Sequence, residues 1–318
     1  MKKQLTFIII ILSLLVVLAA CGDENNPDNN TNSDDKQENT DETKTFAAKN
    51  GDVEIPKNPK NIVTSDSYIG YLLALGIKPA GTSEFGLNVP NFEGMLDDVK
   101  SFGDRTNPSI EKIFDIDPDL IIIGSHIKDV EQLEKIAPVV VMERKGYKDM
   151  LRDFGEITGK QDKASAWIND WEKRMDELKP KVEKVIGDKT ISILSPHAKG
   201  GVYAWGDENG RGGVILYKGF NRKAPEPIQK QLLETDERWM DVSMEKIPEF
   251  AGDIILTVPN DGDDADPSKV YDNPLWKDLP AVKNDQVYRI DDKVGSSFSD
   301  PITLEKRLDK IEKQILQQ

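Results

Sequence analysis

The chain has 318 residues, with 42 lysine and arginine side chains against 57 aspartate and glutamate side chains, which gives a formal charge of −15. This acidity argues against a nucleic-acid-binding protein, which needs a basic surface to meet phosphates. One cysteine excludes a disulfide within the chain. The two histidines, His126 and His197, are too isolated in the sequence to form a metal-ligand cluster.

The N-terminal residues are typical of an export signal. Lys2 and Lys3 precede sixteen uncharged residues, Leu5–Ala20, which are too few for a comfortable membrane span and end in small residues before Cys21. A cysteine at this point resembles the lipobox of bacterial lipoproteins. The resemblance implies a signal peptide at 1–20 and a lipid on Cys21, which anchors the protein on the extracytoplasmic face of a Gram-positive cell membrane. An ordinary signal peptide with an incidental cysteine and an uncleaved anchor are the alternatives.

The segment after the cysteine is polar and acidic. Residues 22–45 contain eight acidic residues, two lysines and no large apolar side chain. Such a segment cannot bury enough surface to offset its ordering entropy, so we expect a disordered tether over 21–46. An acidic tail that binds a partner is the alternative. Loss of Lys2 and Lys3 with the signal takes the formal charge from −15 to −17.

Strand and helix patterns alternate from 47 to 158, which predicts a parallel sheet covered by helices. Helical spacing over 67–76 ends at Gly76, a suitable C-terminal cap, and Pro108–Ser109 opens a second helix. Short apolar runs predict the buried strands. The expected strands are 61–64, 120–123 and 139–142, and a further helix is expected over 130–136.

A long helical pattern extends from 147 to 186, with interruptions at 158–162 and at Lys179–Pro180. Its apolar stripe steps by three and four residues, as expected for one buried face. The stripe consists of Ala164, Trp167, Ile168, Trp171, Met175 and Leu178. Alternation then resumes, with strands expected at 190–194, 201–205, 253–258 and 287–290, and helices at 212–219 and 301–316. We therefore predict two α/β lobes, 47–158 and 188–318, bridged by one long helix at 159–187, with a ligand cleft between the lobes.

Enzyme motifs are scarce. Neither a Gly-x-Ser-x-Gly elbow nor a phosphate-binding Gly-x-x-x-x-Gly-Lys-Ser/Thr loop occurs. The acidic run Asp261–Asp266 lacks the spacing of an EF-hand and is interpreted as a solvated loop. An extracytoplasmic hydrolase that uses paired carboxylates remains an alternative function.

The most informative segment follows the strand at 201–205. Tyr203 and Trp205 lie on one face of that strand, which leads into the glycine-rich loop Gly206–Gly213. Arg211 in this loop and the free N–H groups of the helix that follows favour anions. We expect the loop at the carboxyl edge of the sheet, where ligands of open α/β folds bind. A tight turn with a surface arginine and two core aromatic residues is an equal alternative.

From residue 47 to 318 the chain resembles the iron-siderophore substrate-binding lipoproteins of ABC importers, and most closely their ferric hydroxamate-binding branch of the ferrichrome or ferrioxamine type. The resemblance rests on motifs spread along the chain. These are 53–63, Ser109–Ile113 before Asp117–Ile121, Lys135–Pro138, Gly206–Gly213 with Leu216–Tyr217, Pro274–Leu279 before Ala281–Lys283, and Val287–Tyr288. The fold that it implies is two α/β lobes joined by a rigid helix.

The resemblance also implies roles for individual residues. Arg211 is similar to an arginine that bonds the iron-coordinating oxygens, with Tyr203 and Trp205 as an aromatic wall beside it. Arg144 stands where hydroxamate binders often carry an aromatic, and the region around Ser296–Phe298 has fewer rings than aromatic-rich relatives, which favours a more anionic, citrate-based hydroxamate. The remaining expected ligand contacts are Tyr68, Asn209, Ser297 and Phe298. Glu111 and Glu245, one in each lobe, resemble the carboxylates that dock on permease arginines, and two ordinary helix-surface glutamates are the alternative.

The function implied is that of a lipid-anchored solute-binding protein, a monomer that captures a ferric siderophore and delivers it to the permease of an ABC importer. It needs no catalysis and no cofactor, because the siderophore itself fills the coordination sphere of iron. Ferric citrate, haem or cobalamin are alternative ligands of the same scaffold.

Overall fold

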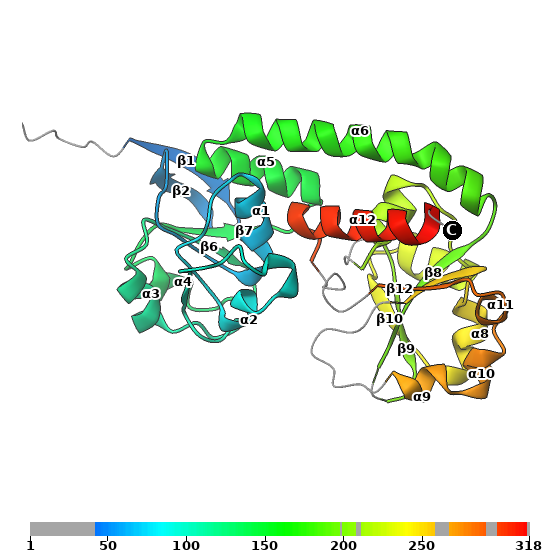
Figure 1. The fold of residues 1–318 in the computed structure, drawn as a ribbon. Coiled ribbons are helices and arrows are strands. Elements are labelled where there is room, and N and C mark those ends of the chain that lie inside the picture. Colours follow the sequence, from blue (N-terminus) through cyan, green and yellow to red (C-terminus); the bar gives the residue numbers. More distant parts are fainter. Residues whose placement is uncertain (1–41, 198, 208–210, 258–266, 291–297, 317–318) are drawn as a thin grey trace, which may run out of the picture. The chain divides into compact units, whose positions relative to one another are not determined.

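The computed structural model describes residues 42–197, 199–207, 211–257, 267–290 and 298–316 (Figure 1). The expected signal peptide, Cys21, Asn209, Ser297 and the acidic run Asp261–Asp266 lie outside these residues. Within the described residues, no helix combines the length and the apolar character needed to cross a membrane.

The N-terminal lobe contains a five-stranded sheet in the order β5-β4-β3-β6-β7, and all of its strand pairs are parallel. This confirms the predicted parallel sheet. The strands are β3 (Ile62–Thr64), β4 (Gly81–Thr82), β5 (Lys100–Ser101), β6 (Leu120–Gly124) and β7 (Val139–Met142). The helical elements of this lobe are η1 (Asp66–Tyr68), α1 (Ile69–Ala74), α2 (Glu84–Leu87), η2 (Pro90–Phe92), α3 (Ile110–Ile116) and α4 (Val130–Leu133).

Side chains of β6 alternate between two apolar layers, as the pleat requires. Leu120 and Ile122 pack in the layer that contains α1 and α5 (Tyr147–Thr158), whereas Ile121 and Ile123 pack in the layer that contains α3 and α4. Both faces are therefore covered, which explains why the sequence of this strand is a continuous apolar run.

An antiparallel hairpin, β1 (Thr43–Ala48) and β2 (Gly51–Pro56), precedes the sheet. Its turn residue Asn50 accepts a hydrogen bond from Val141 N and donates one to Val139 O, both at 3.0 Å, so the turn covers the edge strand β7. This hairpin corrects the expected tether boundary at residue 46. Thr43–Phe46 are already part of a strand, because Phe46 is buried in the core and holds the hairpin in place.

Helix α6 (Gln161–Ile186) is the long helix that the apolar stripe predicts (Figure 1). The expected interruption at Lys179–Pro180 is wrong, since the helix continues through Pro180. Val182 and Ile186 extend the buried stripe beyond the proline, and this packing outweighs the backbone hydrogen bond that a proline cannot donate.

The C-terminal lobe contains a mixed sheet in the order β10-β9-β8-β11-β12. Its strands are β8 (Ile191–Pro196), β9 (Val202–Trp205), β10 (Trp239–Val242), β11 (Ile254–Thr257) and β12 (Val287–Arg289). Strands β8, β11 and β12 are parallel to one another, but β9 is antiparallel to β8 and to β10. The C-terminal sheet is therefore mixed, unlike the fully parallel sheet of the N-terminal lobe.

Short helical elements surround this sheet, and the chain reaches α12 (Pro301–Leu316) at the position predicted from the sequence. The short elements are η3 (Val214–Gly219), α7 (Glu226–Ile228), η4 (Gln229–Leu233), η5 (Met244–Lys246), α8 (Ile247–Phe250), α9 (Ser268–Tyr271), α10 (Pro274–Lys277) and α11 (Pro280–Lys283). The expected helix at 212–219 is a single π-helical segment, η3.

Helix α6 joins the two apolar cores. Ala164 and Ile168 belong to the core of the N-terminal lobe, whereas Trp171, Met175 and Leu178 belong to the core around β8. The predicted fold class, two α/β lobes bridged by one long helix, is confirmed.

Candidate ligand-binding site

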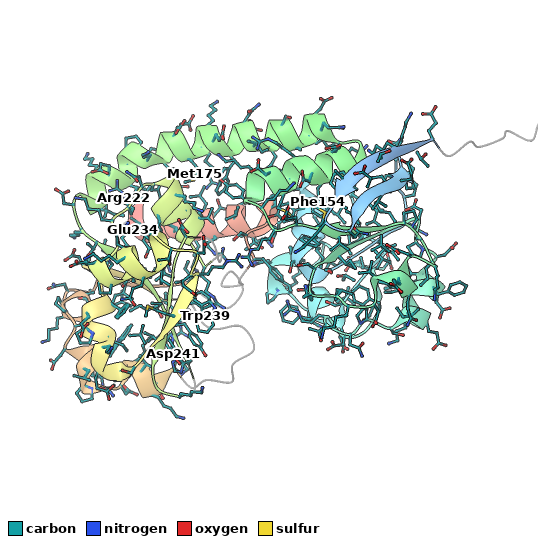
Figure 2. The ribbon with its side chains drawn as sticks, turned by 180° about the vertical axis from the view of Figure 1, so that it is seen from behind. Phe154, Met175, Arg222, Glu234, Trp239 and Asp241 are labelled. Carbon is teal, nitrogen blue, oxygen red and sulfur yellow. The ribbon has the colours of Figure 1, made fainter. Side chains whose placement is uncertain are left out.

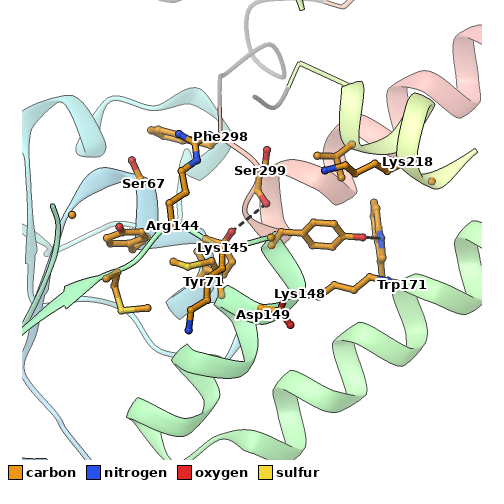
Figure 3. Close-up of a pocket in the computed structure, with 18 of the residues that line it drawn as sticks. Ser67, Tyr71, Arg144, Lys145, Lys148, Asp149, Trp171, Lys218, Phe298 and Ser299 are labelled. Carbon is orange, nitrogen blue, oxygen red and sulfur yellow. Dashed lines mark hydrogen bonds between the residues drawn. The ribbon is translucent and has the colours of Figure 1, made fainter. Parts of the chain in front are cut away.

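A cavity of about 830 Å³ is lined by side chains from both lobes and from α6 (Figure 3). This volume lies in the range of small-molecule pockets. The described lining residues of the N-terminal lobe include Ser67, Tyr68, Tyr71, Arg105, His126 and Arg144. Helix α6 contributes Trp171, Glu172, Met175 and Asp176, and the C-terminal half of the chain contributes Val214, Lys218, Phe298 and Ser299.

The turn after β7 and the first residues of α5 bring a group of cations to the cavity. Arg144, Lys145 and Lys148 follow the carboxyl end of β7, where side chains of a parallel sheet converge on a ligand. Lys145 forms an ion pair with Asp153 at 2.8 Å, and Lys148 forms one with Glu172. Lys218 approaches Asp207 at 3.6 Å. Local carboxylates thus hold these lysines, and the cavity wall presents mixed charge rather than bare cations.

Three phenols face the same space. Burial raises the pKa of Tyr68 to about 12, with nearby Arg144 acting in the opposite direction. The Tyr71 hydroxyl donates to Ser299 O at 3.4 Å, and the Tyr147 hydroxyl accepts from Trp171 Nε1 at 2.8 Å (Figure 3). Because Tyr68 stays protonated at neutral pH, it can donate a hydrogen bond to an oxygen-rich ligand.

A second aromatic cluster lies on one face of the C-terminal sheet. The β9–β10 register pairs Trp205 with Trp239 and Tyr203 with Asp241, so these four side chains share a face. Tyr203 and Trp239 lie 5.0 Å apart between ring centroids, and Trp205 and Trp239 lie 6.2 Å apart. Trp239 is 47% exposed, and Figure 2 shows it on β10 together with Asp241. The cluster therefore offers an aromatic surface to solvent.

Arg211 joins this cluster. Its guanidinium carbon lies 4.3 Å from the centroid of the Trp205 ring, and the side chain is almost fully buried. The backbone there is left-handed, with φ 49° at Arg211, and the loop then closes tightly. A β-carbon on Gly213 would lie 2.0 Å from Gly206 O, so only glycine fits. These two constraints direct the arginine back over the ring.

The position expected for this loop is wrong. Because β9 runs antiparallel to β8, the loop after Trp205 leaves the sheet at the end where β8, β11 and β12 begin, not at their carboxyl edge. Strand direction depends on tertiary pairing and not on the local apolar pattern that predicted the strand.

The expected ligand contacts thus fall into two groups. Tyr68, Arg144 and Phe298 line the cavity. Tyr203, Trp205 and Arg211 form the aromatic cluster and are not among its described lining residues. Glu111 on α3 and Glu245 on η5 are exposed, one in each lobe, away from the cavity lining.

Sequence reasoning missed several lining residues. Tyr147 and Lys148 are the first residues of α5 and come three and four positions after Arg144, at the start of a predicted helical pattern, which is a usable signal. Arg105 and Lys218 carry no local signal, since their positions depend on long-range packing. Trp239, which belongs to the aromatic cluster rather than to the described lining, was missed because β10 itself was not predicted. Among the described residues, no group of three His, Cys, Asp or Glu side chains could hold a metal ion.

Comparison with known proteins places the chain in a family. Residues 62–294 match the family model described as periplasmic binding protein. The chain belongs to this family. Membership identifies a substrate-binding protein rather than an enzyme, as the scarcity of catalytic motifs predicted.

Individual relatives support membership in the periplasmic binding protein family. The iron(3+)-hydroxamate-binding protein FhuD of Bacillus subtilis (strain 168) is 40% identical over 276 residues, which are 85% of this chain and 85% of that protein. A crystal structure of a periplasmic binding protein component of a Fep/Fec-like ferrichrome ABC transporter, also from Bacillus subtilis, superposes with a TM-score of 0.78 at 37% identity. The aligned region covers 86% of this chain and 100% of the crystallised chain. FhuD2 of Staphylococcus aureus with bound ferrioxamine B has a TM-score of 0.69 at 28% identity, and covers 81% of this chain and 98% of its own.

Proposed function

We propose that this protein captures a ferric hydroxamate siderophore outside the cytoplasm and delivers it to the permease of an ABC importer. The proposal is supported by the side chains that line the cavity, taken together with the ligands for which the relatives are named. Phenols and cations surround a volume of about 830 Å³, and two relatives that align over 85% and 86% of the chain are named for an iron(3+)-hydroxamate and a ferrichrome system.

The cavity suits a preformed iron complex. A ferric trihydroxamate presents oxygens of partial negative charge around the iron and apolar linkers between them. Arg144 and the protonated Tyr68 supply hydrogen-bond donors for those oxygens, and Phe298 and Met175 supply apolar surface for the linkers. Because the siderophore occupies every coordination position of the iron, the protein needs no metal ligands of its own.

The aromatic cluster of Tyr203, Trp205 and Trp239, with Arg211 beside it, is the second surface that we propose contacts the siderophore. Stacking on Trp205 fixes the plane of the Arg211 guanidinium, which limits the side-chain entropy lost when it bonds an anionic oxygen. We propose that the siderophore meets this cluster through the exposed ring of Trp239 and meets the cavity through Arg144.

The membrane arrangement is part of the same proposal. Residues 1–20 act as a signal peptide, Cys21 carries the lipid, and the polar segment after it leads to the first strand at Thr43. The protein works as a monomer, and Glu111 and Glu245 are its docking carboxylates for the permease.

A fluorescence titration of the purified chain tests ligand and site together. Trp171 lines the cavity, so a bound ferric complex should quench tryptophan emission. We expect saturable quenching with ferric ferrioxamine B and ferrichrome and much weaker quenching with ferric citrate. Arg144→Ala should weaken binding about tenfold or more, the usual loss of a charge-assisted hydrogen bond of ~1.5–3 kcal/mol.

Arg152→Ala is the matched control, because Arg152 on α5 is exposed and pairs with Asp149. Equal effects of the two substitutions would exclude Arg144 from the site. Saturation by ferric citrate alone would overturn the hydroxamate assignment.

A second pair of variants tests the aromatic cluster. Arg211→Ala should weaken binding far more than Arg222→Ala does. Arg222 is also nearly buried, but it binds Phe220 O, Gly187 O and Glu183 at the end of α6. Both variants should lose thermal stability, so only a selective loss of affinity in Arg211→Ala supports a ligand contact.

A further inference from the structure

Arg105, a lining residue of the cavity, is held from two sides. Its Nη2 donates to Asp66 Oδ2 at 2.7 Å, and its guanidinium carbon lies 4.1 Å from the centroid of the Phe85 ring. Asp66 is almost fully buried, and Ser83 Oγ donates to its other oxygen at 3.3 Å. A buried, hydrogen-bonded carboxylate and a ring face therefore fix an arginine whose side chain is still 40% exposed.

Phe85 itself is not among the described lining residues, yet it contacts two that are. Besides Arg105, it meets Phe298 edge to face, with centroids 6.3 Å apart and planes at 86°. Phe298 in turn stacks on the buried Phe92. Phe85 is 38% exposed on α2, a short helix that Ser83 caps by accepting from Gly86 N at 3.0 Å. The Phe85 ring, on a capped helix, therefore contacts the lining residues Arg105 and Phe298 without itself being part of the described lining.

An arginine side chain that is free to rotate loses much entropy when a ligand fixes it, and advance positioning removes that cost. Asp66 engages Nη2, and the guanidinium has further N–H donors. The ring of Phe85 sets the plane in which those donors lie, because cations prefer the ring face.

We propose that Phe85 is a positioning residue, which holds Arg105 in the orientation that binds the hydroxamate oxygens of the cargo. This proposal rests on the proposed function, since it takes a ferric hydroxamate as the ligand. It assigns Phe85 an effect on affinity without a contact to the ligand, transmitted through Arg105.

A double-mutant cycle tests this assignment, with the dissociation constant of ferric ferrioxamine B as the readout. Phe85→Leu should weaken binding about three- to tenfold, as expected for a cation–π contact of ordinary strength. Phe85→Tyr should retain affinity, because it keeps the ring. In an Arg105→Ala background, Phe85→Leu should cause no further loss, since the side chain that Phe85 orients is gone.

Phe114→Leu is the matched control, because Phe114 on α3 is 67% exposed and does not line the cavity; it should leave affinity unchanged. Melting temperatures of all variants show whether they are folded. If Phe85→Leu weakens binding equally in both backgrounds, Phe85 does not act through Arg105 and the proposal is overturned. If Arg105→Ala binds as the unmodified protein does, this proposal fails while the proposed function stands. If the unmodified protein does not bind the probe, the proposed hydroxamate function fails first.

Discussion

Gly70 on α1 and Asp300 at the start of α12 are packed so closely that a β-carbon on Gly70 would lie 1.7 Å from Asp300 Oδ1. Asp300 is almost fully buried and caps α12. Its Oδ1 accepts from Thr303 N at 3.1 Å and its Oδ2 accepts from Thr303 Oγ1 at 2.7 Å. The absence of a side chain at residue 70 is therefore what allows the last helix to begin against the N-terminal lobe.

Gly70→Ala should destabilise the protein by about 1–3 kcal/mol or more, because the added methyl group overpacks a rigid, hydrogen-bonded site. A loss of stability would be informative, because glycine-to-alanine changes inside helices otherwise stabilise a protein by up to ~1 kcal/mol. Urea denaturation measures the change. Gly146→Ala is the control, because no atom lies within 4 Å of a β-carbon there. A stabilised Gly70→Ala variant would contradict the packing argument.

The raised pKa of Tyr68 predicts that the protein loses stability at alkaline pH. Burial raises its pKa from the ordinary value of 10 to about 12, with Arg144 lowering it and Asp66 raising it further. Since the folded-state pKa lies above the unfolded one, its contribution to stability is fully present below pH 10 and is lost as pH rises to about 12. Over that window the free energy of unfolding should fall more steeply in the unmodified protein than in Tyr68→Phe, by up to ~2–3 kcal/mol. Parallel curves for the two proteins would show that Tyr68 is not responsible.

How far the sequence predicts the fold depends on the kind of element. Strand β7 and helix α12 were predicted at their observed bounds, since a proline precedes the strand and local apolar patterns define both. The hairpin at Asn50–Gly51 was missed, although Asn-Gly between alternating residues is a strong turn signal. The sequence also contained a signal for the antiparallel direction of β9, which was missed. The expected strands at 190–194 and 201–205 are joined by too few residues for a parallel crossover, which needs a dozen or more.

The site was less predictable than the fold. Tyr68 lies within the helical pattern expected over 67–76 and Arg144 follows the strand expected at 139–142, so the resemblance could place them. Arg105 reaches the cavity only because Asp66 and Phe85, 39 and 20 positions earlier in the chain, pack against it. Such an arrangement depends on tertiary contacts between short elements, and no periodicity in the sequence encodes it.

The docking role proposed for Glu111 and Glu245 can be tested apart from ligand binding. Glu111 and Glu245 are exposed, and hydrogen bonds from its own backbone N–H and from Ser243 lower the pKa of Glu245. Charge reversal at both positions, Glu111→Arg with Glu245→Arg, should impair siderophore-dependent iron uptake in cells through like-charge repulsion at the permease. The purified double variant should bind its siderophore normally. Normal uptake at normal expression would identify the two residues as ordinary helix-surface glutamates.

The proposed lipid anchor predicts a change of location without a change of affinity. Cys21→Ala should release the protein from the membrane fraction, because the thiol proposed to carry the lipid is lost. Ligand binding should be unchanged, since the polar residues 22–41 carry no side chain able to join an apolar core. Immunoblots of membrane and soluble fractions measure the first effect, and quenching titrations measure the second. Membrane retention of the variant would point to an uncleaved anchor.

Helix α12 lies beside the bridging helix α6 and also contacts both lobes. Alongside α6, helix α12 begins against Gly70 and packs into the core around β8, and side chains link the two helices at three points. Trp167 Nε1 donates to Glu305, and Arg174 pairs with Asp309 at 2.6 Å and with Glu312 at 2.9 Å. One helix alone between two lobes resists bending but allows the lobes to twist about the helix axis. Two neighbouring helices joined by side-chain contacts resist both motions. Cargo exchange in this protein should therefore rely on side-chain rearrangement at the cavity mouth rather than on a hinge, and X-ray scattering profiles with and without cargo should nearly coincide.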